Sequence, residues 1–177
     1  MECVKTESVK TNRILRAAIG LLTVALVYVI YAGIHQRVVV AGDSAPEFTI
    51  LAENGRAVSV PKFGGKLLVL NFWATWCPPC VEEMPSLVEM QRRMKAKGIT
   101  VLAVSVDVDQ GAYLQFLKEH NVNLLTVRDP GQKSNALYGT FRFPETYVID
   151  RNGVMRRKFV GGVDWTAPDI TEFLGRM

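Results

Sequence analysis

The sequence predicts an α/β domain with a central mixed sheet and helices on both faces, together with an N-terminal β-hairpin and one transmembrane helix. Two apolar runs, at residues 66–73 and 99–106, are typical of strands that are covered on both faces of a sheet. A helical stretch at residues 78–98 separates them, which makes a βαβ unit. The elements that follow are a helix, a strand, a short helix, a hairpin and a closing helix, and this order favours a mixed sheet.

The first element is the apolar segment AAIGLLTVALVYVIYAGI at residues 17–34, which contains no charged residue. An α-helix of this length covers roughly 27 Å, close to the thickness of the hydrocarbon core of a bilayer. Four basic residues precede the segment and few follow it, so the positive-inside rule places the N-terminus in the cytoplasm. We therefore expect a single-pass cell-membrane protein whose later residues lie outside the cytoplasm. A cleaved signal peptide, with VVAG at residues 39–42 as its cleavage site, is the alternative.

Turn signals and periodicity define the elements after this segment. Asn54-Gly55, between the runs EFTIL and AVSV, is a strong signal for a hairpin. Gly98 is expected to end the central helix, because glycine readily adopts the left-handed C-cap conformation. The later elements are a helix at 111–121, a strand at 123–127, a short helix at 134–139, strands at 145–150 and 154–160, and a helix at 165–177. The predicted parts of the chain are a cytoplasmic N-terminus at 1–16, a transmembrane signal anchor in contact with lipid at 17–36, a linker at 37–46 and the α/β domain at 47–177.

Composition and charge narrow the function. The 177 residues are 49% hydrophobic and include three cysteines, too few for a domain held together by disulfides. The net charge of +4 lies mainly in residues 1–42, which carry five basic and two acidic residues. The rest of the chain has 16 basic and 15 acidic residues, without the concentrated basic face that nucleic-acid binding requires. We therefore expect no nucleic-acid partner.

The candidate reactive residues are Cys77 and Cys80. They flank Pro78 and Pro79, at the point where a predicted buried strand ends and a helix begins. A helix N-terminus can stabilise a thiolate, which favours a redox couple. A purely structural disulfide is an alternative, but closing so short a loop would stabilise the fold weakly. A zinc site lacks a second cysteine pair and suitable histidines, so we expect no metal.

The motif FWATWCPPC followed by VEEMP, together with FPETYVID downstream, resembles the membrane-anchored thioredoxin-like reductases of the TlpA/ResA/DsbE type over about residues 43–175. The resemblance implies a thioredoxin-like fold and a thiol-disulfide oxidoreductase without a bound cofactor. Its redox-active disulfide would join Cys77, the exposed nucleophile, to Cys80, the resolving cysteine. The expected partners are protein disulfides, with apocytochrome c in cytochrome c maturation as one substrate, and a membrane thiol-transfer protein as electron donor.

The two prolines are expected to tune the redox potential. Pro78 and Pro79 lack the amide hydrogens that would otherwise stabilise a thiolate at Cys77, and the amide of Cys80 is the nearest that remains. A weakly stabilised thiolate predicts a couple that reduces its substrate.

Helical periodicity distinguishes two neighbouring glutamates. The residues four, seven and eleven positions after Glu82 are all polar. The residues at the same distances after Glu83 are one leucine and two methionines, which are apolar. Glu83 is thus predicted to face the interior, three residues after Cys80, with a raised pKa that suits proton exchange with that thiol. The resemblance points to the same residue, and Asn71 occupies the position where ordinary thioredoxins carry an acid. An ion-paired glutamate on the flank of the helix is the alternative.

The loop before the strand at 145–150 is the predicted contact for substrate. The resemblance implies a cis bond between Phe143 and Pro144, in a loop that faces the cysteines and pairs through its backbone with a substrate chain. Trp76 is the expected aromatic contact.

Two other functions remain open at this point. The opening SAPEFTIL is also similar to thiol peroxidases of the redoxin type, which carry a proline and a threonine or serine seven and three residues before the reactive cysteine. Leu70 and Ala74 occupy these positions, which disfavours a peroxidase. A membrane-tethered copper chaperone would bind metal through the cysteine pair, but no histidine or methionine is suitably placed near Cys80.

Overall fold

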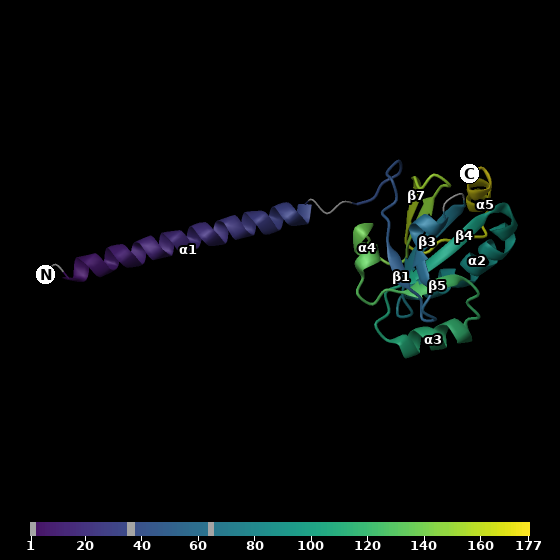
Figure 1. The fold of residues 1–177 in the computed structure, drawn as a ribbon, viewed down its shortest axis with the longest axis horizontal. Coiled ribbons are helices and arrows are strands. Elements are labelled where there is room, and N and C mark those ends of the chain that lie inside the picture. The colour runs from purple at the N-terminus through teal and green to yellow at the C-terminus, as the bar shows by residue number, and fades with distance from the viewer. Residues whose placement is uncertain (1–2, 35–37, 64–65) are drawn as a thin grey trace. The chain divides into compact units, whose positions relative to one another are not determined.

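The computed structural model describes residues 3–34, 38–63 and 66–177 (Figure 1). The chain divides into two units, Met1–Arg37 and Val38–Met177. The first unit contains α1 (Cys3–Ile34). Within α1, Arg13–Tyr31 has a mean hydropathy of 2.1 and is long and apolar enough to cross a membrane. The elements of the second unit are β1 (Thr49–Leu51), β2 (Ala57–Ser59), η1 (Val60–Phe63), β3 (Leu67–Trp73), α2 (Pro78–Met94), η2 (Lys95–Lys97), β4 (Ile99–Ser105), α3 (Gln110–Glu119), β5 (Leu125–Arg128), α4 (Lys133–Leu137), β6 (Glu145–Ile149), β7 (Met155–Val160) and α5 (Pro168–Gly175).

A five-stranded mixed sheet forms the centre of the second unit, with the strand order β5-β4-β3-β6-β7. The strands β3, β4 and β5 run parallel, whereas β6 and β7 are antiparallel to their neighbours. The hairpin of β1 and β2 forms a separate two-stranded sheet. The predicted mixed sheet and N-terminal hairpin are therefore confirmed.

Apolar side chains of β3 alternate between two cores, one on each face of the sheet. Val69 and Trp73 belong to the cluster that contains buried residues of α2, α3 and α5. Leu70 and Phe72 belong to the other cluster, which includes Tyr138 at the end of α4 and residues of the hairpin. The continuous apolar run of β3 is thus explained by burial on both faces, as predicted.

The boundaries differ from the predicted ones at two places beside β4. The α-helical part of α2 ends at Met94, and η2 continues it to Gly98, whose φ of +77° gives the left-handed turn into β4. β5 begins at Leu125, two residues later than predicted, because the open edge of β4 is occupied there by Gln91. Its side chain accepts a hydrogen bond from Val101 N and donates one to the carbonyl oxygen of Ile99.

Candidate active site

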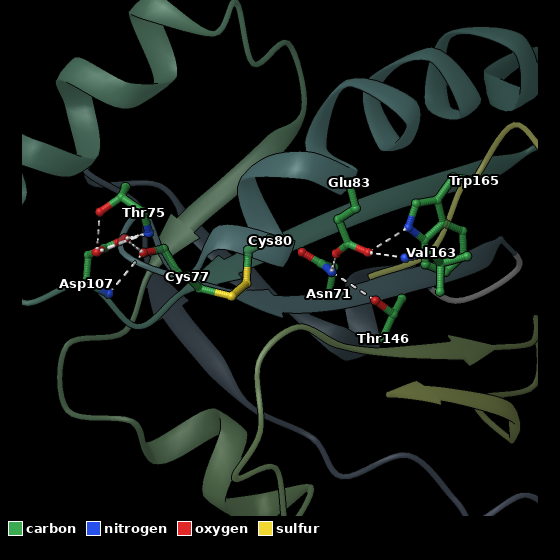
Figure 2. The surroundings of a disulfide bond; sticks show 10 residues. Asn71, Thr75, Cys77, Cys80, Glu83, Asp107, Thr146, Val163 and Trp165 are labelled. Atoms are coloured by element: carbon green, nitrogen blue, oxygen red, sulfur yellow. Dashed lines mark hydrogen bonds between the residues drawn. A yellow bond between two sulfur atoms is a disulfide. The ribbon is translucent and has the colours of Figure 1, made fainter. Parts of the chain in front are cut away.

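The two cysteines of the motif are joined by a disulfide at the start of α2 (Figure 2). Cys77 is the N-cap of the helix and Cys80 lies in its first turn. Cys77 is 5% exposed and Cys80 is fully buried. Cys77 is thus the more accessible of the two, but it is much less exposed than the sequence led us to expect. The reason is that it packs into the same core cluster as Trp73 and Cys80.

The first turn of α2 offers few backbone donors to a thiolate. Pro78 and Pro79 occupy the first two helical positions and carry no amide hydrogen. The amides of Cys80 and Val81 both donate to the carbonyl oxygen of Cys77, at 3.0 and 3.1 Å. The amide of Cys80 is therefore already engaged within the backbone. Among the described residues, no amide of this first turn is therefore left free beside Cys77 in the oxidised protein.

Replacing Pro79 by histidine should shift this couple towards oxidation. The substitution restores one amide hydrogen in the first turn and adds an imidazole that can be cationic beside Cys77. We expect the pKa of the Cys77 thiol to fall and the reduction potential to rise, because the reduced form gains stability. Equilibration of the full chain with glutathione buffers measures the potential. An unchanged or lower potential in Pro79→His would show that the two prolines do not set it.

The loop before Cys77 is held by a buried carboxylate that was not predicted from the sequence. Asp107, 3% exposed, lies two residues after the end of β4. Its carboxylate accepts hydrogen bonds from the backbone N–H of Thr75 at 3.0 Å, from the Thr75 hydroxyl at 2.7 Å and from the Ser105 hydroxyl at 2.6 Å. These contacts fix the chain two residues before the nucleophile. The feature of the sequence that could have indicated Asp107 is an acidic residue at the carboxyl end of a buried strand.

Glu83 is buried in the second turn of α2, with 4% of its surface exposed, whereas Glu82 is exposed. Its Oε1 accepts a hydrogen bond from Asn71 Nδ2 at 2.8 Å. Its Oε2 accepts hydrogen bonds from Val163 N at 3.1 Å and from Trp165 Nε1 at 3.3 Å (Figure 2). The helix period therefore identified the inward-facing glutamate correctly, but nothing in the sequence indicated Val163 or Trp165 as its partners.

Burial raises the pKa of Glu83 from 4.5 to about 7. Desolvation of the carboxylate is the main cause, and hydrogen bonds from Val163, Asn71 and Trp165 offset it in part. A carboxyl group with a pKa near neutrality can both accept and return a proton at physiological pH. The raised pKa that the sequence predicted is thus present in the structure.

The stability of the oxidised protein should fall as the pH rises from about 4.5 to about 7. Between these values the folded protein keeps the Glu83 proton that the unfolded chain releases, so each rise in pH favours unfolding. A pKa shift of this size corresponds to about 3 kcal/mol of stability lost above pH 7. Urea unfolding of the full chain in detergent, followed by tryptophan fluorescence across this range, measures the slope. The Glu83→Gln variant should lack this component, and an equal slope in both proteins would contradict the assignment.

The loop between β7 and α5 packs closely on the start of α2. A Cβ atom on Gly162 would lie 3.3 Å from the carbonyl oxygen of Pro79, so a side chain there would press on the first turn. Ser86 anchors the same loop, because its hydroxyl accepts a hydrogen bond from Trp165 N at 3.1 Å. An open pocket of about 280 Å³ lies between this loop and α2, and Glu83 is one of the residues that line it.

The loop before β6 contacts the cysteine motif through a pair of aromatic rings. The Phe143–Pro144 peptide bond is cis, as predicted. The rings of Trp76 and Phe143 meet edge to face, with centroids 6.1 Å apart, and Trp76 is 64% exposed. Within the described residues, the backbone N–H and carbonyl groups of Phe143 form no hydrogen bond to the rest of the chain. The predicted contact residues therefore lie together at the site, and the backbone groups of Phe143 have no partner among the described residues.

Comparisons with known proteins agree with this geometry. The Redoxin family matches residues 40–174. The chain is 30% identical over 172 residues to the thiol-disulfide oxidoreductase ResA of Bacillus thuringiensis subsp. konkukian, covering 95% of this chain and 98% of that protein. It is 33% identical over 156 residues to ResA of Geobacillus thermodenitrificans, covering 87% and 88% of the two chains.

A solved structure described as the thiol:disulfide interchange protein DsbE from Chlorobium tepidum is similar in fold. Its TM-score is 0.69 at 33% identity, over 78% of this chain and 94% of that chain. The mixed sheet, the disulfide at the start of α2 and these similarities lead to one conclusion. The chain belongs to the redoxin family and is a thioredoxin-like thiol-disulfide oxidoreductase of the ResA/DsbE type.

Proposed function

We propose that this oxidoreductase is anchored in the cell membrane by α1 and reduces protein disulfides outside the cytoplasm, with apocytochrome c as one substrate. The observation that carries the proposal is the start of α2, where none of the described amides is free to stabilise a Cys77 thiolate. Strongly oxidising members of this fold owe their potential to a stabilised reduced form. A couple without that stabilisation tends to give its electrons to a substrate disulfide. The name of the ResA relatives, thiol-disulfide oxidoreductase, supports exchange chemistry.

Reduction of the substrate proceeds in two exchange steps. The Cys77 thiolate attacks one sulfur of the substrate disulfide, forms a mixed disulfide and releases the other sulfur as a thiolate. Cys80 then loses its proton to Glu83 and attacks the Cys77 sulfur, which forms the observed disulfide and releases the second substrate thiolate. Two electrons pass to the substrate, and the Cys77–Cys80 bond is the oxidised product. No bound cofactor takes part in this scheme, because the two sulfurs carry the electrons.

Substrate binding uses the surface beside Cys77. An extended segment of the substrate pairs with the free backbone of Phe143 next to Pro144, and its side chains pack on the exposed ring of Trp76. A membrane thiol-transfer protein then reduces the Cys77–Cys80 disulfide by the reverse exchange. The apolar segment within residues 17–36 holds the enzyme in the lipid, and the excess of basic residues before it places the cysteines outside the cytoplasm.

The test uses the reduced full chain in detergent and two oxidised peptides. One peptide contains Cys-x-x-Cys-His, the haem-attachment sequence of c-type cytochromes, and the control has the same composition with the histidine moved away. We expect faster reduction of the first peptide, measured by the formation of free thiols. Equal rates would contradict the preference for apocytochrome c. Faster consumption of hydrogen peroxide than of either disulfide would favour the redoxin-type peroxidase, and tight binding of copper by the reduced chain would favour the metal chaperone.

A further inference from the structure

The side chain of Asn71 is fully buried under the first turns of α2, and half of its hydrogen-bonding capacity is unused. Nδ2 donates to Glu83 Oε1 at 2.8 Å and to Thr146 Oγ1 at 2.9 Å, so both amide hydrogens are engaged. Oδ1 is buried and accepts no hydrogen bond within the described residues. A buried carbonyl oxygen without a donor is unfavourable, so its place in the structure needs a reason.

The unpartnered oxygen lies on the side of the disulfide. Asn71 is on the same face of β3 as Val69 and Trp73, which belong to the core cluster that contains Cys80. Cys80 and Glu83 lie three residues apart on α2, so their side chains project on neighbouring parts of one helix surface. Figure 2 shows Asn71 between them, with its nitrogen towards Glu83 and its oxygen towards Cys80.

In the oxidised protein Cys80 has no hydrogen to offer, because its sulfur is bonded to Cys77. When a dithiol reduces this bond, the S–S bond breaks, two electrons and two protons pass to the two sulfurs, and the dithiol becomes a disulfide. Cys80 then carries an S–H group, which is a weak donor. Reduction thus creates a donor in the place where the oxidised protein has an unpartnered acceptor.

We infer that Asn71 is a positioning residue whose Oδ1 accepts a hydrogen bond from the Cys80 thiol in the reduced protein while its Nδ2 holds Glu83. One amide group would then orient both partners of the proton exchange. Asparagine suits this position because it carries a donor and an acceptor on the same carbon. An aspartate would keep the acceptor but place a second carboxyl group against Glu83. The inference requires only that the disulfide opens reversibly, so it does not depend on the identity of the substrate.

The S–H stretching band in the infrared spectrum tests this hydrogen bond directly, because its frequency falls when the thiol donates. The full chain with Cys3→Ser and Cys77→Ala has Cys80 as its only thiol. We expect adding Asn71→Leu to shift the band to higher frequency. The control is Asn135→Leu, which removes another buried asparagine with an unpartnered Oδ1, located in α4, and should leave the band in place. A band at the same frequency with and without Asn71 overturns the inference, whether that frequency is high or low.

A second measurement avoids the risk that Asn71→Leu fails to fold. In the chain with both active-site cysteines, the side-chain carbonyl carbon of Asn71 should change its NMR chemical shift when dithiothreitol reduces the disulfide. The corresponding carbon of Asn135 should not change. Equal behaviour of the two asparagines would contradict a hydrogen bond that forms on reduction.

Discussion

Replacing Cys80 by serine is expected to stop turnover and to leave the substrate attached to Cys77. The first exchange step needs only the Cys77 thiolate, whereas release of the substrate needs the thiol of Cys80. The variant should therefore accumulate a mixed disulfide that a reductant dissolves. Non-reducing gel electrophoresis and mass spectrometry of the full chain, mixed with an oxidised protein substrate, would detect it. Cys3→Ser in the background removes the third thiol as a source of adducts.

Cys77→Ser is the matched control for this experiment. It leaves Cys80, whose surface is fully buried, as the remaining cysteine of the motif. We expect no turnover and almost no mixed disulfide, because a substrate sulfur cannot approach the buried thiol. Equal trapping by both variants would mean that the order of attack is reversed or that the first turn of α2 opens during catalysis.

Much of the fold could be predicted because its strongest signals are local in the sequence. The buried strands β3 and β4 are continuous apolar runs, and α2 carries a regular apolar stripe, so each follows from the burial of its own side chains. The late start of β5 could not be predicted in the same way. It depends on Gln91, which comes from another element and covers the edge of β4.

In the active site, too, features that depend on local sequence could be predicted, whereas contacts with distant segments could not. The helix period placed Glu83 in the interior, and the family motif indicated the cis bond before Pro144. The donors to Glu83 Oε2 come from a loop about eighty residues later, and no pattern in the sequence joins these positions. The low exposure of Cys77 was missed for a related reason, since it results from packing of the assembled core.

The sequence alone indicated little about the contacts of Asn71. The resemblance marked it only as the place where an acid of ordinary thioredoxins is absent. The structure shows that the amide is a hydrogen-bond donor to the glutamate that the sequence offered as a substitute for that acid. The amide of Asn71 on β3 and the buried carboxyl group of Glu83 on α2 are therefore parts of one hydrogen-bonded arrangement.

Glu83→Gln is expected to slow disulfide reduction near neutral pH by about 10²-fold, the lower end of the range for general acid-base catalysis. At pH 7 a carboxyl group with a pKa of about 7 is roughly half ionised, so it can take the Cys80 proton before the resolving step. Glutamine keeps the shape but cannot exchange a proton. The loss should fall on the resolving step, so the variant should accumulate mixed disulfide on Cys77 although both cysteines are present.

Glu82→Gln is the control on the same helix. Because Glu82 is exposed, its replacement should leave the rate of disulfide reduction nearly unchanged. Rates of the two variants should be compared at matched stability across pH 5–9, since a loosened helix would also slow the reaction. In the unmodified protein the rate should increase with pH through about 7, as Glu83 becomes an ionised base, and this step should be absent from Glu83→Gln. Both variants carry the same two cysteines, so the difference between their pH profiles isolates the contribution of the Glu83 carboxyl group. If Glu82→Gln and Glu83→Gln gave the same rates and the same pH profile, the buried carboxyl group would take no part in proton transfer, and Cys80 would lose its proton to water.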